Sequence, residues 1–413
     1  MTNFEKNLNE KEALRAELFE KQRIEEFLRS ENRDLWSYIG NLKSLPMFGK
    51  AIYLLQKMDF LLKFLVKSTA ETSSTTDNLT FKNYLSDLKT KNLDVLFVLT
   101  NNKLEIGGIQ TSVKLAEDLS AAGFVVKITS INFDPSAENH KFYIPSQSVE
   151  NLNSIKSIVS CGAETVALTN LIVEKFKSKS ILLMLGADHY FTPLWNDAKN
   201  FINAIQTYDL IIALSPLLKK IAQSLDAKNI VCAPLGFDNK VFNFKKMTKS
   251  NQIVINCRDS TEKGLRFLLP QIPKLREMGW RVVGFGDVKD PKFAEVFDYF
   301  YGRLTKREIY ELLLNSKILL DASFIEGLGL VALEAAASGC VPIISKRHDY
   351  HELFHENEIP YIEIDNFIDP NIVFSAIKLA EKIKPEDIVE YVKEVNWENG
   401  SQIVQESIRN LLN

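Results

Sequence analysis

The sequence has 413 residues, which is enough for two to three domains with sizeable cores. Its content of 46% hydrophobic and 25% charged residues is that of an ordinary soluble globular protein. The formal net charge of -3 implies no general affinity for nucleic acid, so we predict no nucleic-acid partner.

The four cysteines and five histidines suggest neither a disulfide framework nor a metal site. The cysteines lack C-x-x-C spacing, and the three clustered histidines, His348, His351 and His355, fit a solvated helix. We therefore predict no metal and no cofactor. The N-terminus has no signal-peptide pattern, and no run of about 18 uncharged apolar residues predicts a spanning helix. The expected location is the cytoplasm, with the inner face of the cell membrane as a peripheral alternative.

The first 80 residues have the pattern of a helical extension that ends in a linker. Residues 5–43 are charged, with leucines at a seven-residue spacing near the end, which indicates one or two long helices or a short coiled coil. Residues 48–67 predict a helix that is apolar on nearly all sides and carries four lysines. Packing on its own domain, self-association through residues 5–67 and binding to an anionic membrane surface all stay open. Residues 69–80 are rich in Ser and Thr, as linkers are.

A series of alternating strands and helices begins near Leu93. Residues 94–99 predict a buried strand, Gly107 and Gly108 open a helix, and residues 124–128 predict the next strand, which makes a parallel sheet. The two glycines are not the G-x-G-x-x-G fingerprint, so a nicotinamide cofactor is disfavoured, and tight turning alone would explain them. Further strands are predicted at residues 157–160, 181–185, 209–213 and 229–232.

His189 follows one of these strands, at the end where open α/β sheets bind ligands. A role in binding and a loop position without any role explain this histidine equally well. The Pro- and Gly-containing residues 233–242 then mark a turn, and the polar residues 243–251 read as a linker to a second domain.

The second domain starts with a predicted strand at residues 252–257, followed by Arg258 and Lys263. Two cations at the carboxyl end of a strand, beside the helix that opens at Gly264, would suit a diphosphate. Two solvated loop charges are the alternative. After a strand at residues 281–286, the loop that contains Arg303 and Leu304 leads into a helix through an N-cap.

Residues 324–339 form the most informative stretch. They follow a predicted strand at residues 318–322 and form a glycine-punctuated turn and a helix rich in Leu and Ala. Glu326 lies in the turn and Glu334 in the helix, where both carboxylates can point into one pocket. Two carboxylates for hydroxyls and a helix N-terminus for phosphate suit a nucleotide-sugar, whereas an ordinary strand-turn-helix is the alternative. The backbone N–H groups that would favour an anion are those of Gly329, Leu330 and Val331.

This stretch closely resembles the E-x7-E motif of retaining glycosyltransferases with the GT-B fold, in the large group-one family. It departs from the pattern E-G-[FL]-G-L-x-x-[LI]-E-A-x-A-x-G-x-P-[VI]-[IV] only where Val341-Pro342 replaces Pro-Val. Arg258 to Gly264 resembles the G-R-L-x-x-x-K-G pattern, with Cys257 and Asp259 in place of Gly and Leu. Three other segments are similar to the family in the same order: Gly107-Gly108, the P-x-G-x-D-x-x-x-F segment at residues 234–242, and Trp397-Glu398.

The resemblance implies an α/β protein with the GT-B fold, in which two Rossmann-like, doubly wound domains face each other across a cleft. It covers the chain from about Leu93 to the C-terminus. The expected parts are the N-terminal helical extension and linker at residues 1–80, an acceptor-side domain at 81–245, a nucleotide-sugar-binding domain at 246–385, and a C-terminal helix at 386–413 that crosses back to the first domain.

The resemblance also assigns roles to residues. Glu326 would hold the hydroxyls of the transferred sugar, His189 would support that sugar, and Glu334 would bind the ribose. Arg258, Lys263 and the N–H groups near Leu330 would neutralise the departing diphosphate without a metal. In the family, Gly107 and Gly108 let the backbone approach the donor phosphates, and the loop of Arg303 and Leu304 borders the nucleobase.

The implied activity is retaining transfer of a sugar from a nucleotide-diphosphate-sugar to a glycan or lipid-linked acceptor, in bacterial surface polysaccharide or glycoconjugate assembly. A nucleotide-sugar epimerase of the same fold is one alternative. A non-catalytic protein that recruits a partner through its N-terminal helices is another.

Overall fold

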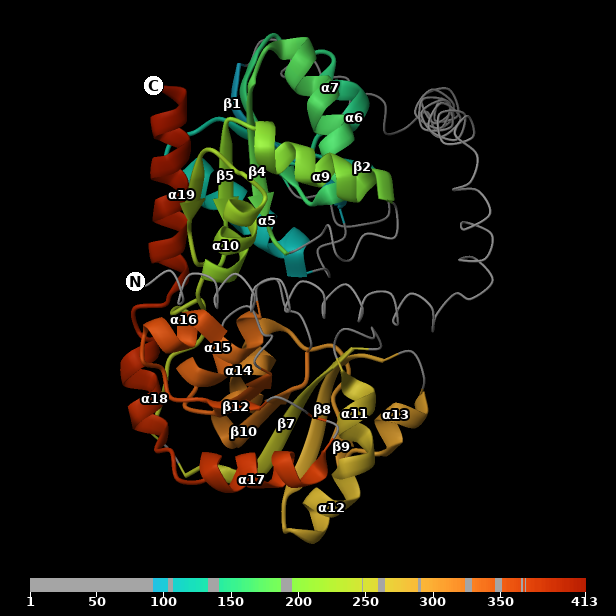
Figure 1. Ribbon diagram of the computed structural model, residues 1–413, viewed down its shortest axis with the longest axis vertical. Coiled ribbons are helices and arrows are strands. Elements are labelled where there is room, and N and C mark those ends of the chain that lie inside the picture. Colours follow the sequence, from blue (N-terminus) through green and yellow to red (C-terminus); the bar gives the residue numbers. More distant parts are fainter. Residues whose placement is uncertain are drawn as a thin grey trace, which may run out of the picture. The chain divides into compact units, whose positions relative to one another are not determined.

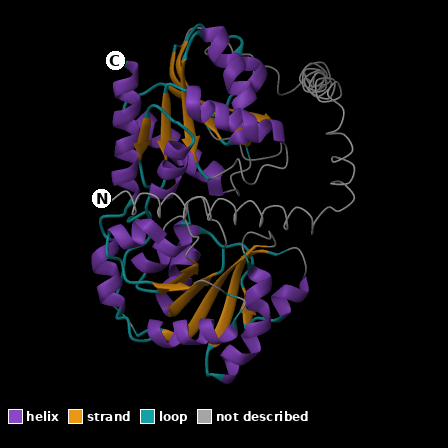
Figure 2. Ribbon diagram, viewed as in Figure 1, coloured by secondary structure: helices purple, strands orange, loops and turns teal. Residues whose placement is uncertain are grey.

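The computed structural model describes most of the chain from residue 92 onward. The described residues are 92–102, 107–132, 141–186, 195–246, 248–258, 264–288, 291–323, 329–345, 351–364, 367 and 369–413. They contain two six-stranded sheets in which all paired strands are parallel, and helices cover both faces of each sheet (Figures 1 and 2). The predicted α/β fold class is thus confirmed. The helical extension and linker predicted at residues 1–80 lie outside the described residues.

The first sheet has the strand order β2-β1-β3-β4-β5-β6. Each strand predicted from the sequence is present, with small shifts at its ends, because strands covered on both faces are nearly continuous apolar runs. The strands are β1 (Leu93–Asn101), β2 (Val126–Asn132), β3 (Ile155–Cys161), β4 (Lys179–Met184), β5 (Leu210–Ala213) and β6 (Ile230–Cys232). The helices are α5 (Gly107–Ala121), α6 (Ser146–Val149), α7 (Val166–Phe176), α9 (Trp195–Thr207) and α10 (Pro216–Ser224).

The second sheet has the order β12-β11-β10-β7-β8-β9. Its strands are β7 (Ser250–Arg258), β8 (Arg281–Asp287), β9 (Tyr299–Phe300), β10 (Ser316–Asp321), β11 (Val341–Ser345) and β12 (Ile362–Ile364). Its helices are α11 (Leu265–Leu268), α12 (Ile272–Glu277), α13 (Pro291–Glu295), α14 (Lys306–Asn315), α15 (Leu330–Ala337), α16 (His351–Glu356) and α17 (Pro370–Ala380). We did not predict β9 and β12, since runs of two and three residues are too short to show a strand period.

Both sheets have a point where the strand order reverses direction. In the first sheet β1 has β2 on one side and β3 on the other, and in the second sheet β7 lies between β8 and β10. Ligands of doubly wound sheets bind beyond the carboxyl ends of the strands at such a point. The loop before Gly107 follows β1, and Arg258 ends β7, so the topology places predicted site residues at both reversal points.

The chain crosses from one sheet's domain to the other's twice, and the two crossing segments lie side by side. Phe237 and Asn396 form a parallel bridge, and the N–H of Trp397 donates to the carbonyl of Phe237 at 2.8 Å. Beyond this bridge, α19 (Trp397–Leu412) packs into the core of the first sheet, whereas α18 (Pro385–Val392) packs on α15 of the second. The predicted C-terminal segment 386–413 therefore contains helices of both sheets.

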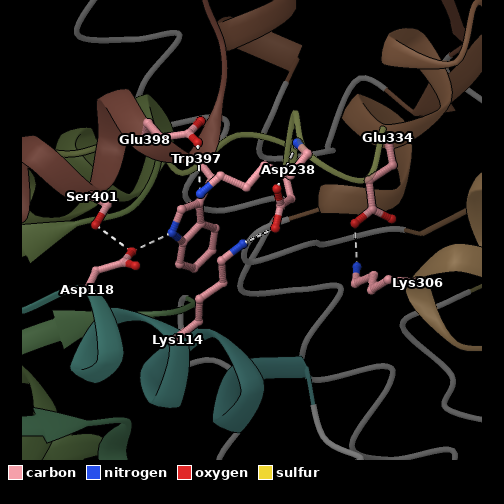
Figure 3. A network of polar contacts seen from close by, with 9 residues as sticks. Lys114, Asp118, Asp238, Lys306, Glu334, Trp397, Glu398 and Ser401 are labelled. Atoms are coloured by element: carbon pink, nitrogen blue, oxygen red, sulfur yellow. Dashed lines mark hydrogen bonds and ion pairs between the residues drawn. The ribbon is translucent and has the colours of Figure 1, made fainter. Parts of the chain in front are cut away.

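Side chains reinforce this double crossing (Figure 3). The Asp118 carboxylate accepts hydrogen bonds from Trp397 Nε1 at 2.6 Å and from Ser401 Oγ at 2.7 Å. Lys114, one turn earlier on α5, forms an ion pair with Asp238 and lies 4.3 Å from the centre of the Trp397 ring. The network thus ties α5, the first crossing and the start of α19 together.

The buried cation of Lys249 directly precedes β7, at the opposite end of this strand from Arg258. Lys249 Nζ donates to three carbonyl oxygens, those of Leu313 at 3.1 Å, Leu314 at 2.7 Å and Ser338 at 2.9 Å. These carbonyls belong to the C-terminal ends of α14 and α15, where a cation satisfies acceptors that the helices leave open. Burial lowers the pKa of Lys249 to about 8.

Lys249→Met is expected to lower the free energy of unfolding by about 2 kcal/mol at pH 7, because it leaves buried carbonyls without a donor. The folded pKa of about 8 lies below the ordinary value of 10.5, so between these values the unfolded chain binds more protons than the folded one. Titration of Lys249 therefore raises the free energy of unfolding of the wild type as the pH rises from about 8 toward 10.5. Urea unfolding at pH 7.5 and pH 9.5 measures the effect, and a gap between wild type and variant that does not widen with pH would contradict it.

Candidate functional site

The carboxyl end of β7 and the loop after β10 meet at the reversal point of the second sheet. Arg258 is the exposed last residue of β7, while Asp321, Ala322 and Ser323 at the end of β10 are buried. Gly264 closes the loop after β7 with a φ of +64°, and a Cβ there would stand 2.2 Å from the Ala322 carbonyl oxygen. Only glycine tolerates both this φ and this approach. The structure therefore brings the end of the predicted diphosphate loop against the loop that leads to the predicted glutamate motif.

Helix α15 presents its N-terminus beside this contact. Gly329, with a φ of 40°, precedes the helix, and no side chain caps the first turn. Among the described residues, the N–H groups of Leu330 and Val331 have no acceptor, whereas that of Ala332 donates to the Gly329 carbonyl at 3.0 Å. Unsatisfied N–H groups at a helix N-terminus favour an anion, and binding of a donor phosphate at this segment stays a prediction.

Glu334 lies in the second turn of α15, and its side chain is only 3% exposed. Its Oε1 forms an ion pair with the ammonium of Lys306, the first residue of α14 (Figure 3). Its Oε2 is buried and has no hydrogen-bond partner among the described residues. A buried acceptor without a donor is unfavourable, and in native proteins it often marks a site that a ligand completes. The alternative interpretation, an ordinary strand-turn-helix with both glutamates in solvent, does not fit Glu334, because its side chain is buried.

Arg303 and Leu304 occupy the loop before α14. The guanidinium of Arg303 donates to Asp287 at 2.6 Å, and both side chains are more than half exposed, so this pair contributes little to stability. Leu304 packs against the core of the second sheet. The Thr305 hydroxyl accepts from the N–H of Glu308, whose carboxylate accepts from the N–H of Thr305, so a capping box fixes the start of α14. The predicted contact of this loop with a nucleobase stays a prediction.

Gly107 and Gly108 begin α5 at the reversal point of the first sheet. Neither has a positive φ, and no atom of the described residues lies within 4 Å of the place where a Cβ of residue 107 would stand. A Cβ at residue 108 would meet Leu185 at 3.4 Å, which is an ordinary contact. Within the described residues, neither backbone conformation nor packing requires glycine at these two positions, and their approach to donor phosphates stays a prediction.

Three predicted catalytic residues, Glu326, His189 and Lys263, lie outside the described residues, and their roles stay predictions. Among the residues that the structure does describe, no three His, Cys, Asp or Glu side chains come together in a way that could hold a metal. Independence from metal remains a prediction. None of the four cysteines forms a disulfide. Within the described part of the chain, every helix is too short or too polar to cross a membrane.

The structure also contains a cavity of about 410 Å³, which lies away from the edge that carries Arg258. It opens between α14 and the first residues of β7 and β8. Its lining includes Gln252, Arg281 and Tyr301. We place the candidate site at the sheet reversal point instead, since the helix N-terminus and the buried carboxylate meet there.

Sequence reasoning missed Lys306 and Asp287, the partners of two predicted site residues. Lys306 follows the N-cap Thr305, a pattern that announces a helix but not a partner 28 positions away. Asp287 ends a strand, and its pairing with Arg303 depends on how the next loop returns. Neither pairing has a signal in the spacing of the residues.

Comparison with known proteins supports the architecture, and it finds a family that part of the second domain matches. Residues 251–370 match the family described as Glycosyl transferases group 1. No curated protein matches the sequence. Among solved structures, the sucrose-phosphate synthase from Thermosynechococcus elongatus is 16% identical with a TM-score of 0.64, over 77% of this chain and 99% of that one. Anabaena HepE in complex with UDP-glucose is 12% identical with a TM-score of 0.60, over 78% and 99%.

A third solved structure is the apo form of the lipopolysaccharide outer core galactosyltransferase WaaB, 12% identical with a TM-score of 0.58, over 77% of this chain and 99% of that one. At these identities the likenesses define the fold, which is GT-B. Residues 251–370, the part of the chain that the family model covers, match the group 1 glycosyltransferases.

Proposed function

We propose that the protein is a retaining glycosyltransferase that uses a nucleotide-diphosphate-sugar donor. The observation that carries this proposal is the buried carboxylate of Glu334, in the helix that begins at the sheet reversal point. One of its oxygens has no partner within the part of the chain that the structure describes. A sugar hydroxyl is a neutral donor that such an oxygen can accept. The family match and the solved complex of HepE with UDP-glucose support the same class of donor.

The reaction breaks the bond between the anomeric carbon and the β-phosphate oxygen, and forms a bond from that carbon to an acceptor oxygen on the same face. The acceptor's proton passes to the departing phosphate oxygen, which gives a nucleoside diphosphate and a glycoside. Arg258, Lys263 and the N–H groups of Leu330 and Val331 would stabilise the charge that develops on this oxygen. Glu326 would hold the sugar hydroxyls, and His189 would support the sugar from the first domain.

Closure of the two domains over the donor would exclude water and suppress hydrolysis. We propose a glycan or a lipid-linked molecule as the acceptor, in bacterial surface polysaccharide or glycoconjugate assembly. The likeness of WaaB, which acts on lipopolysaccharide outer core, supports this class. Binding of residues 5–67 to an anionic membrane surface or to a second copy stays a prediction.

The first test of this proposal is a thermal-shift screen with UDP, GDP, ADP and their glucose conjugates. A ligand that binds only the folded protein raises the melting temperature by mass action, so one base is expected to stand out. The shift should persist in excess EDTA, since fixed protein groups replace a divalent ion. A protein whose melting temperature does not respond to any of these nucleotides would contradict a nucleotide-sugar donor.

A further inference from the structure

Lys306 contacts the proposed donor site through its ion pair with Glu334. It is the first residue of α14, where the capping box of Thr305 and Glu308 fixes the backbone. Its ammonium meets Oε1 of Glu334, and its side chain is 46% exposed. The side chain of Lys306 is thus partly in solvent, whereas the carboxylate that it pairs with is buried.

The pairing divides the two oxygens of Glu334 between two tasks. Lys306 occupies Oε1, whereas Oε2 is buried and none of the described residues bonds to it. The carboxylate is thus held in one orientation and has one oxygen left for a hydrogen bond from a ligand. The pair as a whole carries no net charge, so the donor that completes it is a neutral hydroxyl rather than a cation.

An unpaired carboxylate would be unsuited to a site for a diphosphate. Arg258 and the α15 N-terminus favour negative charge, whereas a buried negative charge beside them repels it, and burial strengthens this repulsion. A lysine on the neighbouring helix removes the conflict, since it neutralises the carboxylate without blocking its second oxygen.

We infer that Lys306 is a positioning and specificity-determining residue, which neutralises Glu334 for an anionic nucleotide and leaves Oε2 to accept one ribose hydroxyl. This inference rests on the proposed function, because it assumes that a nucleotide occupies the site. On this inference Lys306 strengthens binding of the diphosphate by removing a repulsive charge. Glu334 strengthens binding of the ribose by accepting a hydrogen bond.

The test measures binding of UDP, GDP and ADP by calorimetry, each against its 2′-deoxy and 3′-deoxy forms and against the uncharged nucleoside. Lys306→Met should weaken binding of the diphosphate that wild type prefers by about tenfold, and binding of the nucleoside much less. Lys306→Arg should restore most of the affinity, since it keeps the charge. Glu334→Gln should reduce the preference for the ribose form over one of the two deoxy forms.

A double-variant cycle separates electrostatics from folding. In the Glu334→Gln background there is no carboxylate charge to neutralise, so adding Lys306→Met should change diphosphate binding little. In transfer assays Lys306→Met should raise the donor KM with little change in kcat. Lys274→Met, which removes a lysine from an exposed ion pair with Glu277, is the matched control and should bind like wild type.

The possible failures are distinct. If wild type binds no nucleotide, the proposed function is wrong and this inference falls with it. If wild type binds and Glu334→Gln is impaired, but Lys306→Met binds like wild type, then Lys306 is only a surface partner and the inference alone is overturned. An equal loss for nucleoside and diphosphate in Lys306→Met also overturns it, because charge then plays no part. Each comparison is repeated with Lys306→Gln, in which the replacement side chain is uncharged but polar, and the same outcomes are expected.

Discussion

Glu334→Gln is expected to reduce the kcat/KM for sugar transfer about 100-fold, with little change in melting temperature. Glutamine has the same shape but no charge, so Lys306 loses its counter-ion and the ribose loses a charge-assisted hydrogen bond. The loss of two such interactions, at about 1.5 kcal/mol each, corresponds to about two orders of magnitude in rate.

Initial rates with a labelled donor measure this effect, and circular dichroism monitors the fold. Glu311→Gln is the matched control, because Glu311 also forms an ion pair with a cation of α14 but at an exposed position. The control should transfer sugar like wild type. A Glu334→Gln enzyme within threefold of wild type would remove Glu334 from the site, and with it the main support for the proposed donor.

Gly236→Ala is expected to lower the free energy of unfolding by about 3 kcal/mol or more, which is a large effect for one methyl group. A Cβ at this position would stand 1.9 Å from the carbonyl oxygen of Val395 and 2.6 Å from the backbone nitrogen of Asn396. Both contacts are with backbone, so relief requires the two crossing segments to separate. Separation would break the bridge between Phe237 and Asn396.

Urea unfolding compares this variant with Gly279→Ala. At Gly279 a Cβ would meet no atom within 4 Å, but the φ of +86° is unfavourable for alanine, so the expected cost is about 1 kcal/mol. The comparison separates the steric approach from backbone strain. If both variants lose the same stability, the two crossings are not held together as tightly as the distances indicate.

The order of strands and helices could be predicted from the sequence because each buried parallel strand is an apolar run of its own. The predicted strand at residues 252–257, for example, is the central part of β7. Two strands, β9 and β12, escaped prediction for a physical reason. Tyr299 and Phe300 form β9 only by pairing with Val283 and Gly284, which are distant in sequence.

The candidate site was predictable to the extent that its residues are neighbours in sequence. Arg258 at the end of a strand and Glu334 within a helix are visible from local patterns, and the structure places them on elements beside one reversal point. The ion pair of Lys306 with Glu334 joins two helices, and the contact of Gly264 with Ala322 joins two loops. Such contacts depend on packing across the sheet, which no spacing along the chain encodes.

The position of α19 has a consequence for biosynthesis. Its residues Trp397, Val404 and Ile408 share a hydrophobic core with Ile109 and Val113 of α5. The first domain is therefore discontinuous in sequence, and its core stays incomplete until α19 has left the ribosome. A fragment cut after the first crossing would expose the apolar surface that α19 covers, so the domain of the first sheet should not be obtainable as an isolated stable piece.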